Sequence, residues 1–180
     1  MLELSLHVLD IVNNSIKANA ETVKIEIDEQ IKKNLLTISI EDDGCGMDEE
    51  FLRNVKDPFR TTRTTRKVGM GLSLFEAAAV ATGGWLKIES EKNVGTKVIA
   101  TFTHDHIDRQ PIGDMAQTIL TLISGNESVD FLYHHIKDDK EFIFDTKEIK
   151  KILGDISFNN PEITLWLSEY IKEGLDGINA

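Results

Sequence analysis

Residues 22–41 read TVKIEIDEQIKKNLLTISIE, and this stretch decides the fold class. Apolar and polar side chains alternate over residues 22–28 and again over residues 35–41. Alternation with a period of two predicts strands that have one buried and one solvated face. The short segment 30–34 between them is the right length for a hairpin connection. The stretch therefore predicts a pair of antiparallel strands.

Residues 86–90 and 96–103 predict two more strands, with a turn between them at residues 93–95. In three of these four strands the second face is largely polar. A doubly wound parallel sheet, which is covered on both faces, would show continuous apolar runs instead. We therefore expect a sheet that helices cover on one face only.

Three segments around the strands predict the covering helices: residues 3–19, a short stretch at 48–54, and the Leu- and Ala-rich residues 72–81. In the first helix we expect an apolar stripe at helical spacing, formed by Leu6, Leu9, Val12 (or Asn13) and Ile16. Residues 1–104 are thus predicted to form a two-layer α/β sandwich.

Residues 105–180 differ from the first part in charge. The whole chain has a net charge of −11, which disfavours nucleic acid binding. Residues 1–104 carry 13 basic and 16 acidic side chains, whereas residues 105–180 carry 7 and 15. We expect a domain boundary near residue 104 and a small α+β C-terminal extension. Its predicted elements are helices at 113–124, 147–153 and 161–173 and strands at 129–136 and 141–145.

The acidic extension is expected to be an interaction module, whose hairpin edge can pair with a protein partner or with a second copy of the chain. No apolar run approaches the length of a membrane span, and residues 1–14 lack the basic flank of a signal peptide. One cysteine, Cys45, excludes an internal disulfide framework. The sequence predicts a cytoplasmic protein without a membrane partner.

Polar and glycine-rich motifs accompany these elements. Asp10 and Asn14 lie one helical turn apart on the first predicted helix. The run DDGCG follows a predicted strand at residues 42–46, and GMGL at residues 69–72 opens a predicted helix. The glycine patterns of P-loop proteins and of dinucleotide-binding folds are not in the sequence. Each glycine pair alone is typical of an ordinary turn or cap.

Together, five segments make the sequence resemble the GHKL ATPase superfamily, which includes gyrase, mismatch-repair ATPases and sensor histidine kinases. DIVNNSIKANA (10–20) is similar to its N-box, DDGCG to its first glycine box and DPFRTTR (57–63) to the phenylalanine box of histidine kinases. VGMGLSL (68–74) is similar to its second glycine box, and VGTKVIATF (94–102) to its closing strand. The resemblance implies a Bergerat-type mixed sheet with an ATP site.

The resemblance also implies roles at the base end of that site. Asp42 would accept a hydrogen bond from the adenine amino group, and Thr96 would hold a water beside it. Gly44 and Gly46 would let the backbone pass close to the base, where a Cβ atom would collide. Asp43 is expected to be a solvated charge.

At the phosphate end, Asn14 would ligate Mg²⁺ through its amide oxygen, and Lys17 would contact phosphate. Gly69 and Gly71, followed by Leu72, would bring backbone N–H groups and a helix N-terminus to the triphosphate. Three basic side chains in the preceding loop would add positive charge, namely Arg63, Arg66 and Lys67. We expect this loop, residues 57–68, to be a mobile lid.

Two functions from different classes remain open. The first is a histidine-kinase-like ATPase domain that stands alone and acts on a separate protein as a kinase, or hydrolyses ATP slowly. The second is a regulatory module that senses ATP without turning it over. Asp10 would orient the attacking water, although hydrolysing relatives usually carry the longer Glu there. None of the five histidines lies in the H-E-x-x-x-P context of a phosphoacceptor helix.

Overall fold

The computed structural model describes residues 3–55 and 70–180. Its longer helices are α1 (Leu4–Lys17), α3 (Met70–Ala81), α4 (Met115–Gly125), α5 (Thr146–Leu153) and α6 (Pro161–Gly177), with short helical turns at α2 (Glu49–Asn54) and η1 (Ile31–Lys33). The strands are β1 (Thr22–Gln30), β2 (Leu35–Asp42), β3 (Leu86–Glu91), β4 (Gly95–Thr103), β5 (Asp130–Lys137) and β6 (Lys140–Asp145). The predicted elements are present, with ends that differ by a few residues.

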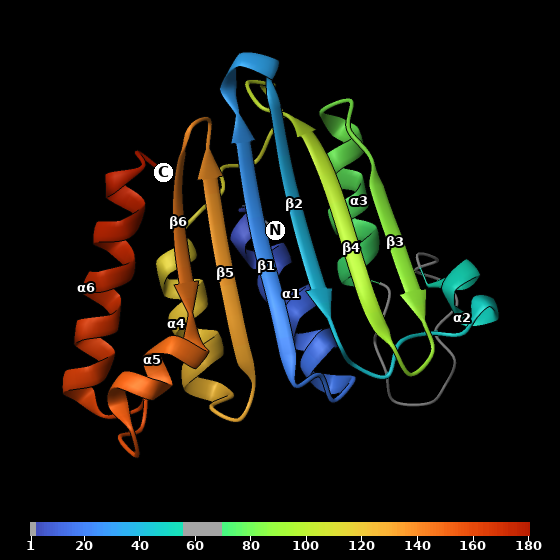
Figure 1. The fold of residues 1–180 in the computed structure, drawn as a ribbon. Helices are drawn as coiled ribbons and strands as arrows, with labels where there is room; N and C mark the ends of the chain where they lie inside the picture. The colour runs from blue at the N-terminus through green and yellow to red at the C-terminus, as the bar shows by residue number, and fades with distance from the viewer. Residues whose placement is uncertain (1–2, 56–69) are drawn as a thin grey trace.

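One mixed sheet organises the chain, in the strand order β3-β4-β2-β1-β5-β6 (Figure 1). Neighbouring strands are antiparallel except β1 and β5, which run parallel. The predicted hairpin joins β1 to β2, and Asn34 closes its turn in the left-handed conformation at φ 53°. In this hairpin Ile25 lies opposite Ile40, and Ile27 opposite Ile38.

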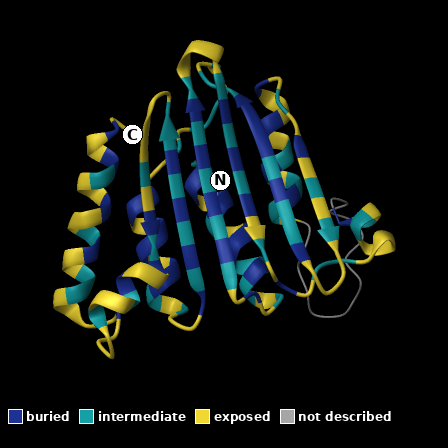
Figure 2. Cartoon of the chain, viewed as in Figure 1, coloured by how far each residue is buried: buried dark blue, intermediate teal, exposed yellow. Residues whose placement is uncertain are grey.

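Helices α1, α3 and α4 lie behind one face of the sheet, and α6 packs against α4 and β6 at its edge (Figure 1). Along β1 and β2, buried residues alternate with half-buried ones (Figure 2). The buried set of β1 and β2 faces the helices: Val23, Ile25, Ile27, Leu36, Ile38 and Ile40. The predicted α/β sandwich, with a mixed sheet that helices cover on one face, is confirmed.

The acidic C-terminal segment continues the same sheet. β5 adds to β1 over residues 22–29 and 130–137, and β6 forms the outer edge. The connection into α4 is tied to the start of α1, because Leu4 N–H donates to the Pro111 carbonyl and Ser5 N–H to the Ile112 carbonyl. The domain boundary at residue 104 and the interaction role of residues 105–180 stay predictions.

The buried side of α1 differs from the predicted stripe. Leu6 is 41% exposed, whereas the polar residues Ser5, His7 and Ser15 are buried. His7 Nε2 lies 3.0 Å from Gln110 Oε1, Ser15 Oγ donates to Asp42, and Ser5 Oγ donates to Glu3. Among the described residues, His7 Nδ1 has no hydrogen-bond partner. Val12 is fully buried, and Leu9 and Ile16 pack partly buried against the core, so the predicted stripe departs from the structure at Leu6 alone. A hydrogen bond lets a polar side chain take a core position, which a hydrophobic pattern assigns to apolar ones.

Candidate functional site

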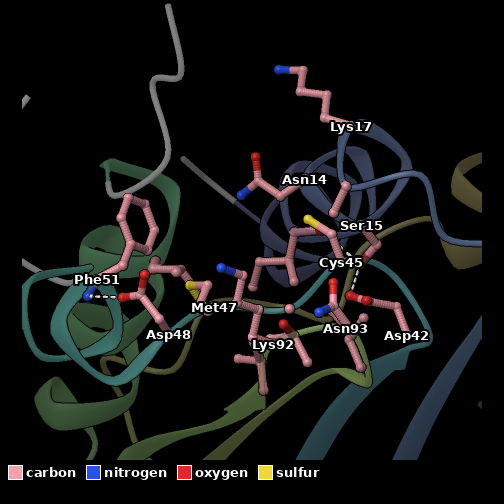
Figure 3. Close-up of a pocket in the computed structure, with 17 residues that line it drawn as sticks. Asn14, Ser15, Lys17, Asp42, Cys45, Met47, Asp48, Phe51, Lys92 and Asn93 are labelled. Atoms are coloured by element: carbon pink, nitrogen blue, oxygen red, sulfur yellow. Dashed lines mark hydrogen bonds between the residues drawn. The ribbon is translucent and has the colours of Figure 1, made fainter. Parts of the chain in front are cut away.

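A cavity of about 320 Å³ lies between α1, the last residues of β2 and the first residues of β4 (Figure 3). The loop after β2, α2 and the β3–β4 turn also contribute to its walls. Its apolar lining comes from Ile11, Ala18, Ile40, Met47, Phe51, Leu72 and Val98. Its other lining residues are Asn14, Ser15, Lys17, Asp42, Cys45, Gly46, Asp48, Lys92, Asn93 and Thr96. Apolar walls combined with convergent polar groups are typical of a small-molecule site.

Asp42 lines this cavity from the last position of β2. Its Oδ2 accepts a hydrogen bond from Ser15 Oγ at 2.5 Å, and its Oδ1 accepts one from Gly44 N–H at 2.8 Å (Figure 3). Thr96 lies directly opposite Asp42 in the β2–β4 register and also lines the cavity. The sheet thus brings together two residues that are 54 positions apart.

Asp43, the adjacent aspartate, has a different task. Its Oδ1 accepts hydrogen bonds from the backbone N–H groups of Glu21 at 2.8 Å and Thr22 at 2.9 Å, so it holds the start of β1. Consecutive residues at a strand end point to opposite sides. Asp42 lines the cavity and Asp43 does not.

The glycine loop after β2 is packed against protein backbone. Gly46 has φ 64°, and a Cβ atom there would lie 2.0 Å from the Glu91 carbonyl oxygen. At Gly44 an added Cβ would lie 2.9 Å from the Ala18 carbonyl oxygen. Cys45 N–H donates to the same Ala18 carbonyl, at 2.9 Å. The loop requires glycine because of these close backbone approaches. That Gly44 and Gly46 also let the backbone pass close to a nucleotide base stays a prediction.

Thr96 is held from the neighbouring strand. Its hydroxyl lies 2.8 Å from Ser90 Oγ, which also donates to the Gly95 carbonyl and accepts from Met47 N–H. This serine of β3 therefore connects the β4 wall of the cavity to the loop that follows the glycine box.

Helix α1 supplies the next part of the site. Asn14 lines the cavity between Ser15 and the α2 side, and Lys17 lies at its outer end (Figure 3). Asp10 lies one turn before Asn14, close to the start of α3. A Cβ atom on Gly71 would be 3.2 Å from Asp10 Oδ2, so glycine permits this contact. Neither Asp10 nor Gly71 is among the described residues that line the cavity.

Several predicted site residues cannot be placed. Arg63, Arg66, Lys67 and Gly69 lie outside the described residues, as do the phenylalanine box and the predicted lid. The structure adds cavity residues that sequence reasoning missed: Ser15, Met47, Phe51, Lys92 and Asn93. Ser15 lies within the N-box segment, but its side chain was given no role there. The other four reach the cavity only through the docking of α2 and the β3–β4 turn.

A second polar cluster lies outside this cavity. Glu29 of β1 is 4% exposed; its Oε1 lies 2.7 Å from His135 Nε2 and its Oε2 lies 2.8 Å from His104 Nε2. Burial alone would raise the pKa of Glu29, but the hydrogen bonds from His135 and His104 lower it to about 2. In residues 3–55 and 70–180, no group of three or more His, Cys, Asp or Glu side chains has an arrangement for a metal ion.

Comparisons with known proteins agree with this architecture. Residues 2–106 match the family described as histidine kinase-, DNA gyrase B- and HSP90-like ATPase. The signal transduction histidine-protein kinase AtoS of Escherichia coli (strain K12) is 35% identical over 96 residues, which are 53% of this chain and 15% of that protein. The sensor histidine kinase CpxA of the same strain is 30% identical over 95 residues, or 50% and 20%. The chain spans 12% of the length of a sensor protein of Shewanella frigidimarina (strain NCIMB 400), 15% of AtoS and 20% of CpxA.

Solved structures share the fold. The N-terminal domain of a DNA repair protein has a TM-score of 0.55 at 18% identity and covers 86% of this chain and 58% of its own. The Aquifex aeolicus MutL ATPase domain complexed with ADP has a TM-score of 0.51 at 17% identity. The match covers 84% of this chain and 69% of the MutL chain. Among the described helices, none is long and apolar enough to cross a membrane. The match over residues 2–106 shows that the chain belongs to the histidine kinase-, DNA gyrase B- and HSP90-like ATPase family.

Proposed function

We propose that the cavity between α1, β2 and β4 binds Mg²⁺–ATP and that the domain transfers the γ-phosphate to a separate protein. The observation that carries this proposal is the meeting of Asn14, Asp42 and Thr96 in one cavity. These residues come from three different elements, and each matches a motif position to which the family resemblance gives a nucleotide contact.

The cavity residues indicate how the nucleotide is oriented, with its base at Asp42 and its phosphates at Asn14 and Lys17. Asp42 accepts a hydrogen bond from the adenine amino group, and the side chains of Ile40 and Val98, which are paired in the β2–β4 register, contact the base. Asn14 and Lys17 lie further out on α1, where phosphate oxygens need positive charge and metal ligation. The start of α3 adds the partial positive charge of a helix N-terminus.

The residues fit a magnesium ion of the kind that accompanies nucleotides. Mg²⁺ takes oxygen ligands and commonly binds through one or two protein oxygens together with phosphates and waters. The Asn14 amide oxygen in the cavity wall would be such a ligand. When bound, the ion neutralises charge on the phosphates. Asn14 then orients the phosphate chain, and Lys17 screens it.

The phosphoacceptor is proposed to be another protein. All five histidines lie in the described part of the chain, and each contacts another group within it. The contacts are His7–Gln110, His104–Glu29, His106–Asp108, His134–Glu26, His134–Glu141 and His135–Glu29. Asp10, next to Gly71 at the start of α3, would assist by orienting the attacking hydroxyl or imidazole group.

ATP sensing without turnover is the second candidate, and the position of Asp10 favours it. Its carboxylate lies against Gly71 and is outside the described cavity lining. A carboxylate in that place can support the helix that meets the phosphates without reaching the reacting atoms.

Nucleotide binding is tested with two ligands on one pair of variants. Calorimetry should show that Asn14→Ala weakens Mg²⁺–ATP binding more than adenosine binding, because the nucleoside needs no metal ligand. Asn13→Ala is the matched control, since Asn13 is its half-buried neighbour outside the cavity lining. Equal weakening of both ligands would contradict the metal role of Asn14.

Turnover is tested with γ-labelled ATP and Mg²⁺. The full chain is incubated alone and with soluble protein fractions, and both free phosphate and labelled protein are followed. Under the transfer proposal, label appears on another protein and Asp10→Asn lowers the rate about 10²–10⁴-fold at nearly unchanged ATP affinity. Asp10→Glu keeps or raises the rate. Tight ATP binding without release or transfer in any fraction supports the sensing candidate.

A further inference from the structure

Ser15 is a buried hydroxyl whose proton has a defined destination. It is 3% exposed on α1, and its Oγ lies 2.5 Å from Asp42 Oδ2 and 3.4 Å from the Ile11 carbonyl oxygen. A hydroxyl has one proton, and short O–H···O⁻ bonds to carboxylates are the stronger kind. The proton therefore goes to Asp42, and the Ser15 oxygen keeps its lone pairs.

Two donors from different elements fix the Asp42 carboxylate. Ser15 Oγ donates to Oδ2, and Gly44 N–H donates to Oδ1 at 2.8 Å. A carboxylate has about four lone-pair sites, so each oxygen retains capacity for a second donor. Because rotation of the carboxylate would break both bonds, its remaining lone pairs have one orientation relative to the cavity.

We propose that Ser15 is a positioning residue that acts through Asp42 and sets the selectivity of the site for a purine with an exocyclic amino group. The inference rests on the proposed function, because it requires the base to meet Asp42. A ligand amino group gains from an acceptor that is already oriented, whereas a purine without that group gains nothing from it. Removal of the Ser15 hydroxyl thus affects one ligand and spares the other.

The opposite wall is held in a similar way. Ser90 Oγ lies 2.8 Å from the Thr96 hydroxyl and is itself fixed by Met47 N–H at 2.9 Å. Asp42 and Thr96, which are paired in the β2–β4 register, are therefore each held by a serine from a neighbouring element. Ser15 is the better test, because it braces the carboxylate.

The test compares Mg²⁺–ATP with Mg²⁺–purine riboside triphosphate, which lacks the amino group, by calorimetry on the full chain. Wild type should prefer ATP. Ser15→Ala should lose about tenfold in ATP affinity, the scale of a lost hydrogen bond to a charged group, and less than about twofold in affinity for the other triphosphate. Thr118→Ala is the control, since Thr118 Oγ1 is a hydroxyl in α4 that donates to the Asp114 carbonyl.

A double-mutant cycle separates positioning from general support. If Ser15 acts through Asp42, adding Ser15→Ala to Asp42→Asn should change the preference for ATP very little. Ser15→Thr, which restores the hydroxyl, should recover preference, and urea unfolding reports whether each variant is folded. Equal weakening of both triphosphates by Ser15→Ala, or a full ATP preference in that variant, overturns the positioning role alone. If wild type binds neither triphosphate, the proposed function fails and the Ser15 proposal fails with it.

Discussion

Glu29 and Asp42 are two carboxylates of one hairpin with different surroundings. Both side chains continue the buried alternation of β1 and β2 toward the helix-covered face, at opposite ends of the hairpin. Glu29 is 4% exposed, and each of its oxygens contacts a histidine. Asp42 is half-buried, accepts from a serine and a backbone N–H, and lines a cavity. Both oxygens of Glu29 thus contact protein groups away from the cavity, whereas Asp42 has lone pairs left on the cavity side.

The Glu29 cluster joins both parts of the chain. His104 follows β4, and His135 belongs to β5 of the acidic C-terminal segment. Tyr133 Oη lies 2.7 Å from His135 Nδ1, and burial, together with the charge of Glu29, raises the pKa of the tyrosine. A protonated Tyr133 donates to His135, which donates to Glu29, so the chain of donors ends on the carboxylate. The cluster therefore holds β5 against β1.

The largest expected effect is on stability, from Glu29→Ala. The variant leaves the donors of His104 and His135 without their carboxylate, and we expect it to lower the unfolding free energy by about 3–5 kcal/mol. Urea unfolding measures the loss. Glu141→Ala, which removes an exposed contact with His134, should cost below about 1 kcal/mol. Equal stabilities of the two variants would contradict the structural role of Glu29.

Acid should remove the same stabilisation. The pKa of Glu29 falls from 4.5 to about 2 on folding, so its contribution is complete above pH 4.5 and disappears as the pH falls through 2. A shift of this size corresponds to about 3 kcal/mol. The difference in unfolding free energy between wild type and Glu29→Gln should therefore shrink between pH 5 and pH 2. A constant difference over that range would exclude a lowered pKa.

Asp42→Asn is expected to act on binding. The amide presents donors where the adenine amino group needs an acceptor, so ATP affinity should fall by about 1–3 kcal/mol while the unfolding free energy changes little. Calorimetry and urea unfolding provide the two readouts. Asp43→Asn changes the adjacent carboxylate outside the cavity and should retain affinity. Wild-type affinity in Asp42→Asn would remove Asp42 from the site.

Tyr133→Phe should have the smallest effect. It removes one hydrogen bond to His135 and keeps the ring, so we expect a loss of about 1 kcal/mol in unfolding free energy. ATP affinity should not change, because Tyr133 is not among the residues that line the cavity. A larger effect on ATP binding than on stability would show that the two carboxylate regions are coupled.

Local pattern was sufficient for much of the fold. The alternation in residues 22–28 and 35–41 predicts the β1–β2 hairpin and its one-sided covering, because the period of two is a property of each strand alone. The motifs likewise pointed to Asn14, Asp42, Gly46, Leu72 and Thr96, which line the cavity. The roles of these residues in nucleotide binding stay predictions.

Tertiary structure decided what no local pattern contains. Which face of α1 is buried depends on the sheet against which it docks, so Ser15 lies in the core and Leu6 does not. Sequence also left open that β5 pairs with β1 in parallel, because a register between strands 108 residues apart depends on long-range packing. The pairing of β5 with β1 then places His135 within hydrogen-bond distance of Glu29. The role of a carboxylate such as Glu29 or Asp42 therefore depends on the groups that the fold places beside it.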